Sequence, residues 1–251
     1  MILPVSELPQ SEAAQGGRAR SGARAAAWRA ERPRGLLLDF GSVISVSVFE
    51  RHAATELILG LAPGSLTWLG PLAPASDPLW QAMLANRISE RDYWQQRAQE
   101  LGERLGETGW DVPTMLRRIR QDDPNAVVRP QIDALVHAAR AQGMKVGILS
   151  NELELFYGQG FLSGMRFLRD LDAIIDATHN GILKPDPRAY ALAIDALRLP
   201  AEQILFVDDQ FRNIAGGWQV GLQTHYFDLR DVSGNIAAVA ARLGLSVQEL
   251  A

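Results

Sequence analysis

The chain has 251 residues, more than one compact core usually contains and fewer than two full domains need, so one domain with a large insertion is expected. With 47% hydrophobic and 22% charged residues, its composition is that of a folded globular protein, which excludes disorder throughout. No apolar run approaches the ~18 to 20 residues of a membrane span, and residues 1–5 are too short for a signal-peptide core. We therefore expect a cytoplasmic protein without a membrane partner.

The chain contains no cysteine, which excludes disulfide bonds, thiolate metal sites and cysteine nucleophiles. Any metal must then be bound by oxygen or histidine ligands. A hard cation such as Mg²⁺ is the first expectation.

The net charge of −4 is unevenly distributed along the chain. Residues 1–34 contain six arginines and three glutamates, a net charge of +3, so residues 35–251 carry −7. The arginines are separated by Ala, Gly, Gln and Ser, so their positive charge is too dispersed to indicate binding of nucleic acid. We interpret residues 1–34 as a disordered Ala/Arg-rich leader and expect no nucleic-acid partner. An organelle transit peptide is the alternative, against which Glu7 and Glu12 count.

Regular structure is predicted to begin at Gly35, where a short apolar run closed by Asp39 is typical of a buried strand that ends in a tight turn. The following stretch, residues 47–127, has no comparable apolar run and is too long for one crossover connection. It is predicted to be an inserted helical domain. Its expected helices cover residues 50–59, 79–85 and 89–105, the last with Ser89 as N-cap.

Four further strand-like runs follow, at residues 146–149, 173–175, 204–207 and 224–227. Between them lie segments of helical periodicity, such as the stripe made by Ile132, Leu135 and Val136. Short apolar strands that alternate with helices predict an α/β fold with a doubly wound parallel sheet. Residues 35–46 and 128–251 would form this core, with residues 47–127 as the insertion.

Polar side chains follow the predicted strands at their carboxyl ends, where open parallel sheets bind their ligands. These residues are Asp39, Ser150, Asn151, Lys184, Asp208 and Asp209. Three carboxylates brought together at one edge would repel one another unless a cation lies among them. Mg²⁺ with oxygen ligands satisfies this demand.

The order of these motifs resembles the haloacid dehalogenase (HAD) superfamily of aspartyl phosphatases. The four blocks that carry the resemblance are Leu36–Val43, Ile148–Asn151, Leu183–Pro187 followed by Tyr190, and Phe206–Asp209 followed by Asn213. Each block alone is weak, but all four in order are specific, and they span most of the chain. The insertion is similar to the helical cap of the subfamily that contains haloacid dehalogenases and many small-metabolite phosphatases.

The resemblance implies catalytic roles that suit these side chains. Asp39 would be the nucleophile and form an aspartyl-phosphate. Ser150, with the adjacent backbone amide of Asn151, would bind the phosphoryl oxygens. Lys184, one of only two lysines in the chain, would neutralise charge on the nucleophile and on the phosphoryl group. The expected substrate is a small phosphorylated metabolite, and the expected state a monomer or homodimer.

The resemblance also implies a metal site. Asp39 and Asp208 would bind Mg²⁺ directly, Asp209 directly or through water, and the carbonyl of Gly41 would complete the protein ligands.

Gly41 departs from the family pattern. Phosphatases of this family usually carry a second aspartate two positions after the nucleophile, which protonates the leaving group and later activates water. Loss of such a general acid costs about 10² to 10⁴ in rate. Three explanations for the glycine are open. The substrates could have good leaving groups, the proton could come from the cap or from water, or catalysis could be lost. Asp tolerates a positive φ better than most residues, so Gly41→Asp tests them even if the turn requires one.

A haloacid dehalogenase is the alternative enzyme, because attack of Asp39 on carbon needs neither a metal nor an acid at Gly41. The paired acids Asp208 and Asp209 favour the phosphatase, since dehalogenases of this family tend to have a less acidic turn. A catalytically weak relative that binds phosphate is the third interpretation, but the retained Asp39, Ser150, Lys184 and Asp208 argue against it.

Other residues have simpler interpretations. His137 is expected at the surface and Asp186 at a helix start, whereas His52 is a possible replacement for the missing acid. Four tryptophans of the insertion are expected to pack its core rather than to form an aromatic substrate pocket: Trp68, Trp80, Trp94 and Trp110.

Overall fold

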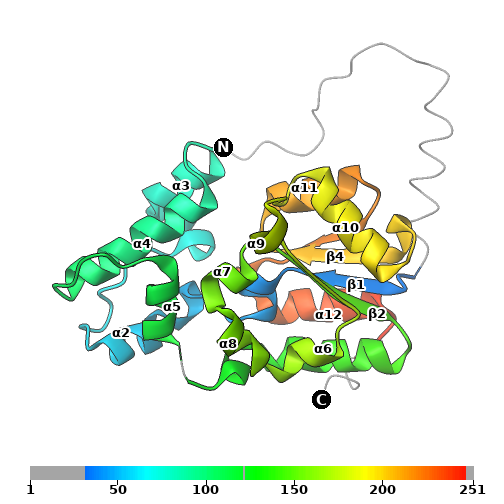
Figure 1. Cartoon of the computed structure of the whole chain (residues 1–251), viewed down its shortest axis with the longest axis horizontal. Helices are drawn as coiled ribbons and strands as arrows, with labels where there is room; N and C mark the ends of the chain where they lie inside the picture. The colour runs from blue at the N-terminus through cyan, green and yellow to red at the C-terminus, as the bar shows by residue number, and fades with distance from the viewer. Residues whose placement is uncertain (1–31, 121, 247–251) are drawn as a thin grey trace, which may run out of the picture. The chain divides into compact units, whose positions relative to one another are not determined.

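The structure is a computed structural model that describes residues 32–120 and 122–246. Its centre is a five-stranded, all-parallel sheet in the order β3-β2-β1-β4-β5 (Figure 1). The strands are β1 (Gly35–Leu38), β2 (Lys145–Ser150), β3 (Ala173–Asp176), β4 (Ile204–Asp208) and β5 (Gln223–Tyr226). Every predicted strand is present, which confirms the α/β fold with a doubly wound parallel sheet.

Helices cover both faces of the sheet (Figure 1). Four of them are α6 (Pro130–Ala141) and α12 (Val232–Arg242) on one face, and α10 (Pro187–Leu197) and α11 (Phe211–Gln219) on the other. Successive residues of β1 alternate between two separate apolar clusters, with Leu36 and Leu38 in the α6/α12 cluster and Leu37 in the α10/α11 cluster. Because both faces are covered, β1 is apolar throughout its length.

The connections that follow β2 and β3 begin with small helices. Three small helices follow β2 and β3, namely α7 (Leu153–Tyr157), α8 (Gln159–Ser163) and α9 (Ala177–Asn180). Asp186 then accepts a hydrogen bond from the backbone N–H of Arg188 and begins α10, which confirms its interpretation as a helix-start residue.

Between β1 and α6, the described part of the insertion contains four α-helices and several short 3-10 helices. The α-helices are α2 (His52–Leu59), α3 (Pro78–Leu84), α4 (Glu90–Arg104) and α5 (Val112–Ile119). The first three match the predicted helices within two residues at each end, and Ser89 is the N-cap of α4, as expected. Helix α5 was not predicted from the sequence; it has only eight residues and contains Pro113 in its first turn, where proline is tolerated.

The insertion has its own apolar cluster, separate from the two clusters of the sheet. At its centre the buried carboxylate of Asp77 accepts hydrogen bonds from Trp80 N (2.9 Å), Tyr93 Oη (2.8 Å) and Arg97 Nη2 (2.6 Å). A buried charge is tolerated only when it is paired and bonded in this way. The network ties α3 to α4 inside the insertion.

Two short segments join the insertion to the core and pair with each other. Val46 N donates to Val127 O (2.9 Å), and Arg129 N donates to Ile44 O (2.8 Å). The buried side chain of Arg129 then donates to Glu50 Oε1 (2.8 Å) and to Ser42 O (2.9 Å). Arg129 therefore links the start of the insertion to the loop that follows β1.

The predicted leader lies outside the described residues except for its last three, residues 32–34. Arg32 Nε donates to Leu243 O (2.6 Å), and Arg34 N donates to Gln203 O (2.8 Å). Within the ranges 32–120 and 122–246, no helix has both the length and the apolar character needed to cross a membrane.

The Arg129 network makes a prediction about stability. Arg129→Met leaves the Glu50 carboxylate and the Ser42 carbonyl without their cationic donor, and we expect the free energy of unfolding to fall by about 3 kcal/mol. Arg230→Met is the control, because Arg230 pairs with Asp228 at the exposed surface, where ion pairs contribute little. Equal losses in the two variants, measured by denaturant unfolding, would contradict this role for Arg129.

Candidate active site

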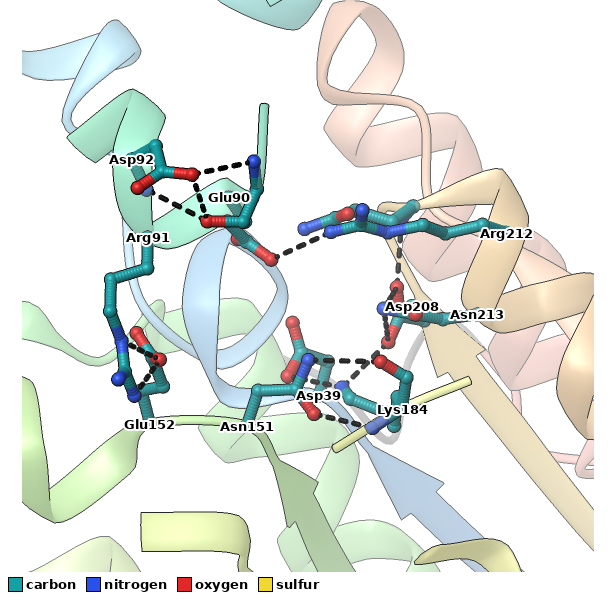
Figure 2. Close-up of polar contacts among 12 residues, drawn as sticks. Asp39, Glu90, Arg91, Asp92, Asn151, Glu152, Lys184, Asp208, Arg212 and Asn213 are labelled. Atoms are coloured by element: carbon teal, nitrogen blue, oxygen red, sulfur yellow. Dashed lines mark hydrogen bonds and ion pairs between the residues drawn. The ribbon is translucent and has the colours of Figure 1, made fainter. Parts of the chain in front are cut away.

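The carboxyl ends of β1, β2 and β4 meet a lysine from the loop between α9 and α10 (Figure 2). The ammonium of Lys184 donates to Asp39 Oδ1 (2.7 Å) and to Asp208 Oδ2 (2.7 Å). Asp39 follows β1, Asp208 ends β4, and all three side chains are almost completely buried. Residues that are far apart in the sequence therefore form one buried, hydrogen-bonded cluster.

Side-chain amides hold this cluster in place. Asn151 accepts a hydrogen bond from Lys184 N (2.7 Å) and donates to Lys184 O (3.3 Å), so it fixes the backbone of the lysine loop. Asn213 Nδ2 donates to both carboxylate oxygens of Asp208, at 3.1 and 3.2 Å. Tyr190 Oη in turn donates to Asn213 O (2.8 Å). These contacts orient Lys184 and Asp208 before any ligand binds.

Burial and charge shift the pKa values of the cluster. Burial raises the pKa of Asp39 to about 7, although the nearby Lys184 ammonium acts in the opposite direction. Burial also raises the pKa of Asp209 well above its ordinary range, with further repulsion from Asp208 and Asp39. Burial alone would lower the pKa of Lys184, but the two carboxylates it contacts outweigh this effect and raise it. The cluster is therefore short of positive charge.

The residues present fit a divalent cation. Asp39, Asp208 and Asp209 each offer a carboxylate oxygen, and these three atoms lie within 4.8 Å of one another. Three carboxylates face the single ammonium of Lys184, and an all-oxygen donor set with excess negative charge suits Mg²⁺. The three carboxylates of the predicted metal site are thus brought together. Gly41, the fourth predicted ligand, lines the same pocket.

The loop after Asp39 differs from one expectation. Gly41 has φ −63° and ψ 131°, which any residue adopts, so the positive φ considered for this position is absent. The left-handed conformation falls instead on Ser42, at φ 63°. Ser42 is held there because its carbonyl accepts from Arg129 and its N–H donates to Ser45 Oγ (3.2 Å). A Cβ added at Gly41 would lie 3.8 Å from Asp39 Oδ2, an ordinary van der Waals contact.

The pocket that opens above the cluster is lined by residues of both the core and the insertion. Ser150 and Asn151 line it, as predicted for phosphate-binding residues, although the Asn151 side chain is engaged by Lys184. His52 is absent from the described lining. Its ring packs against Trp68, with 4.4 Å between ring centroids, and burial lowers its pKa. His52 is therefore no replacement for the missing acid.

Two ion pairs that the sequence does not predict link α4 to the core beside the pocket (Figure 2). Arg212 Nη2 donates to Glu90 Oε2 (3.1 Å), and Arg91 Nε donates to Glu152 Oε1 (2.6 Å). Its position directly after the N-cap Ser89 makes Glu90 a favourable first-turn acid of α4, and nothing in the sequence pattern shows that it also lines the pocket. In one pair α4 supplies the acid and the core supplies the arginine, and in the other pair the roles are reversed. This arrangement of charges fixes the direction in which the start of α4 faces the site.

The remaining interpretations can be compared with the structure. All four tryptophans pack in the cluster of the insertion, as expected, but Trp80 and Trp94 also line the pocket. His137 is exposed at the surface, as predicted.

The family model of the haloacid dehalogenase-like hydrolases matches residues 22–221, most of the chain. The chain therefore belongs to this family of hydrolases, which confirms the resemblance carried by the four sequence blocks. Its relatives include phosphatases as well as haloacid dehalogenases.

Two curated relatives represent both activities. The chain is 29% identical over 99 residues to phosphatase MT3486 of Mycobacterium tuberculosis, covering 39% of this chain and 46% of that protein. It is 28% identical over 146 residues to (S)-2-haloacid dehalogenase 1 of a Pseudomonas species, covering 58% of this chain and 63% of that protein. The chain thus spans less than two thirds of either relative.

A solved structure confirms the fold. The HAD-hydrolase YfnB of Bacillus subtilis, determined with magnesium bound, superposes with a TM-score of 0.57 at 18% identity over 78% of this chain and 87% of that one.

The raised pKa of Asp39 predicts how the stability of the metal-free protein depends on pH. The unfolded chain releases this proton near the ordinary value of 3.8, whereas the folded chain holds it up to about pH 7. Between these values the folded state binds more protons, so its stability falls as the pH rises. Asp39→Asn has the same shape and does not titrate. In chelator, the free energy of unfolding of Asp39→Asn minus that of the wild type should therefore increase from about pH 4 to about pH 7. A constant or shrinking difference would contradict the pKa.

Proposed function

We propose that this hydrolase is an Mg²⁺-dependent phosphatase that acts on small phosphate monoesters through an aspartyl-phosphate at Asp39. The observation that carries the proposal is the buried cluster in which Asp39, Asp208 and Asp209 can share one cation beside Lys184. An anionic phosphate ester needs the positive charge of such a cation and of Lys184 next to the nucleophile.

In the first step an Asp39 carboxylate oxygen attacks phosphorus, and the bond from phosphorus to the leaving oxygen breaks. The product is an aspartyl-phosphate, and the leaving alkoxide or phenoxide takes a proton from solvent. Lys184 holds Asp39 by a 2.7 Å hydrogen bond, which aims the carboxylate and offsets the charge that accumulates on the phosphoryl oxygens. Ser150, at the end of β2, is placed to donate a hydrogen bond to one of those oxygens.

In the second step water attacks the same phosphorus, the bond from phosphorus to Asp39 breaks, and the protons of the water remain on the phosphate that forms. Inorganic phosphate leaves and the free carboxylate is restored, so two easier displacements replace one difficult hydrolysis. Asp39, Asp208 and Asp209, with the Gly41 carbonyl, would hold Mg²⁺, which supplies Lewis-acid stabilisation of phosphoryl charge when bound. We assign residues 47–127 the role of a cap that contributes the wall of the site nearest the leaving group.

A dehalogenase is the second candidate, favoured by the absence of an acid at Gly41 and by the similarity to a haloacid dehalogenase. A 2-haloacid carries its own carboxylate, and among the described residues that line the pocket Lys184 is the only cation. That ammonium is already bonded to Asp39 and Asp208. Without a metal, a haloacid would meet three carboxylates and one committed ammonium, so the electrostatics support the phosphatase.

Metal removal separates these two activities. We expect the purified protein to hydrolyse aryl phosphates with Mg²⁺, to lose that activity in chelator and to recover it when Mg²⁺ returns. Asp39→Asn keeps the shape of the side chain but removes the nucleophile, and its turnover should fall to background. Halide release from a 2-haloacid in chelator, together with no phosphate release in Mg²⁺, would assign the protein to the dehalogenases instead.

Gly41 predicts a dependence on the leaving group. Without a general acid, the rate should fall steeply as the leaving-group pKa rises, and Gly41→Asp should raise kcat/KM for poor leaving groups by about 10² or more. The backbone and the space at Gly41 accept this side chain.

Gly41→Asn is the matched control, because it has the same shape but supplies no proton. If both variants fold and bind Mg²⁺ yet give the same steep dependence on the leaving group, then the missing acid does not explain the departure from the family pattern.

A further inference from the structure

The pocket lining contains two chemically different groups of side chains. One is the carboxylate cluster with Lys184, and the other is a set of apolar side chains, which we call the apolar wall. The apolar wall consists of Phe49, Trp80, Trp94, Val112, Met115 and Leu116 from the insertion, with Leu153 and Phe156 from α7. Most of these side chains are buried members of the apolar cluster of the insertion, and Leu153 belongs to the α6/α12 cluster. Packing therefore fixes their positions.

Both acidic side chains near the apolar wall are already paired. Glu90 is the only residue with a charged side chain that the described insertion helices contribute to the pocket lining, and Arg212 pairs with it at 3.1 Å. Glu152 is paired with Arg91 (2.6 Å) in the same way. The hydroxyls of Ser45 and Ser47 each accept a backbone N–H, from Ser42 and from Glu50.

A polar organic group against the apolar wall would therefore lose its water and meet side chains that offer it few hydrogen bonds. Sugar hydroxyls, a second phosphate or a carboxylate placed against the apolar wall would each be desolvated at a cost. An alkyl or aryl group would instead gain from the removal of its surface from water.

We propose that the substrate is the monophosphate of an apolar, uncharged alcohol or phenol, whose hydrocarbon part packs on the apolar wall while its phosphate lies over the carboxylate cluster. This inference rests on the proposed phosphatase function and names its substrate class. Sugar phosphates, nucleotides and phosphorylated acids are excluded by the same surface. An acidic phenol also fits Gly41, because its phenoxide leaves without a proton donor.

A series of 4-alkylphenyl phosphates, from phenyl to 4-butylphenyl, tests the proposal. Their leaving-group pKa values are nearly constant, so changes in rate report contact with hydrocarbon rather than the missing acid. With Mg²⁺ present, kcat/KM should rise by up to about fourfold per added methylene. 4-Carboxyphenyl phosphate, whose phenol leaves more readily, should nevertheless be a poorer substrate than phenyl phosphate.

A wall variant tests the placement of the hydrocarbon. Val112→Thr keeps the shape of the side chain and replaces one methyl group by a hydroxyl, so it should reduce the gain per methylene more than it changes kcat/KM for phenyl phosphate. Competitive inhibition by n-alkylphosphonates measures the same dependence without turnover, and their inhibition constants should fall with chain length.

The outcomes are distinct. If the aryl phosphates are hydrolysed with Mg²⁺ but kcat/KM is flat along the series, or if a hexose phosphate or 4-carboxyphenyl phosphate is preferred, the substrate class is wrong and the phosphatase stands. If no phosphate ester is hydrolysed, the phosphatase function itself is overturned.

Discussion

The buried ammonium of Lys184 is the interaction on which the site depends. Its two 2.7 Å hydrogen bonds join Asp39 and Asp208, which end two different strands, and so hold two carboxylates closer than their repulsion would allow. One positive charge cannot balance three carboxylates. Burial raises the pKa values of Asp39 and Asp209, and repulsion from Asp208 adds to this effect. A site in this state favours a cation and a phosphoryl group together, since each makes the binding of the other less costly.

The rest of the fold can be understood as support for that cluster. The parallel sheet brings the strand ends to one edge, Asn151 and Asn213 fix the lysine loop and Asp208, and Arg129 fixes the loop after Asp39. Fixed dipoles and charges stabilise a transition state better than groups that must reorganise. Ser42 adopts a left-handed backbone conformation in this arrangement, which costs a small amount of conformational free energy.

The sheet and the carboxylate cluster could be predicted from the sequence because both follow from local patterns. A short apolar run that ends in Asp39 or Asp208 predicts a strand and a polar terminus, and the parallel topology then brings these termini together. The place of Glu90 in the pocket could not be predicted, because its first-turn position in α4 already had a sufficient local explanation. Nor could the contacts of Arg129 be predicted, because its partners Ser42 and Glu50 are more than seventy positions away in the chain. Contacts of that kind depend on tertiary packing, which periodicity does not encode.

The phosphatase account rests on a covalent intermediate at Asp39, and trapping it is the most direct test. The protein is mixed with phenyl phosphate and Mg²⁺, quenched in acid during turnover and digested, and the peptide that contains Asp39 is examined by mass spectrometry. The account predicts one added phosphoryl group on that peptide, dependent on Mg²⁺ and absent from Asp39→Asn. Phosphate release in which this peptide stays unmodified and Asp39→Asn remains active would contradict it.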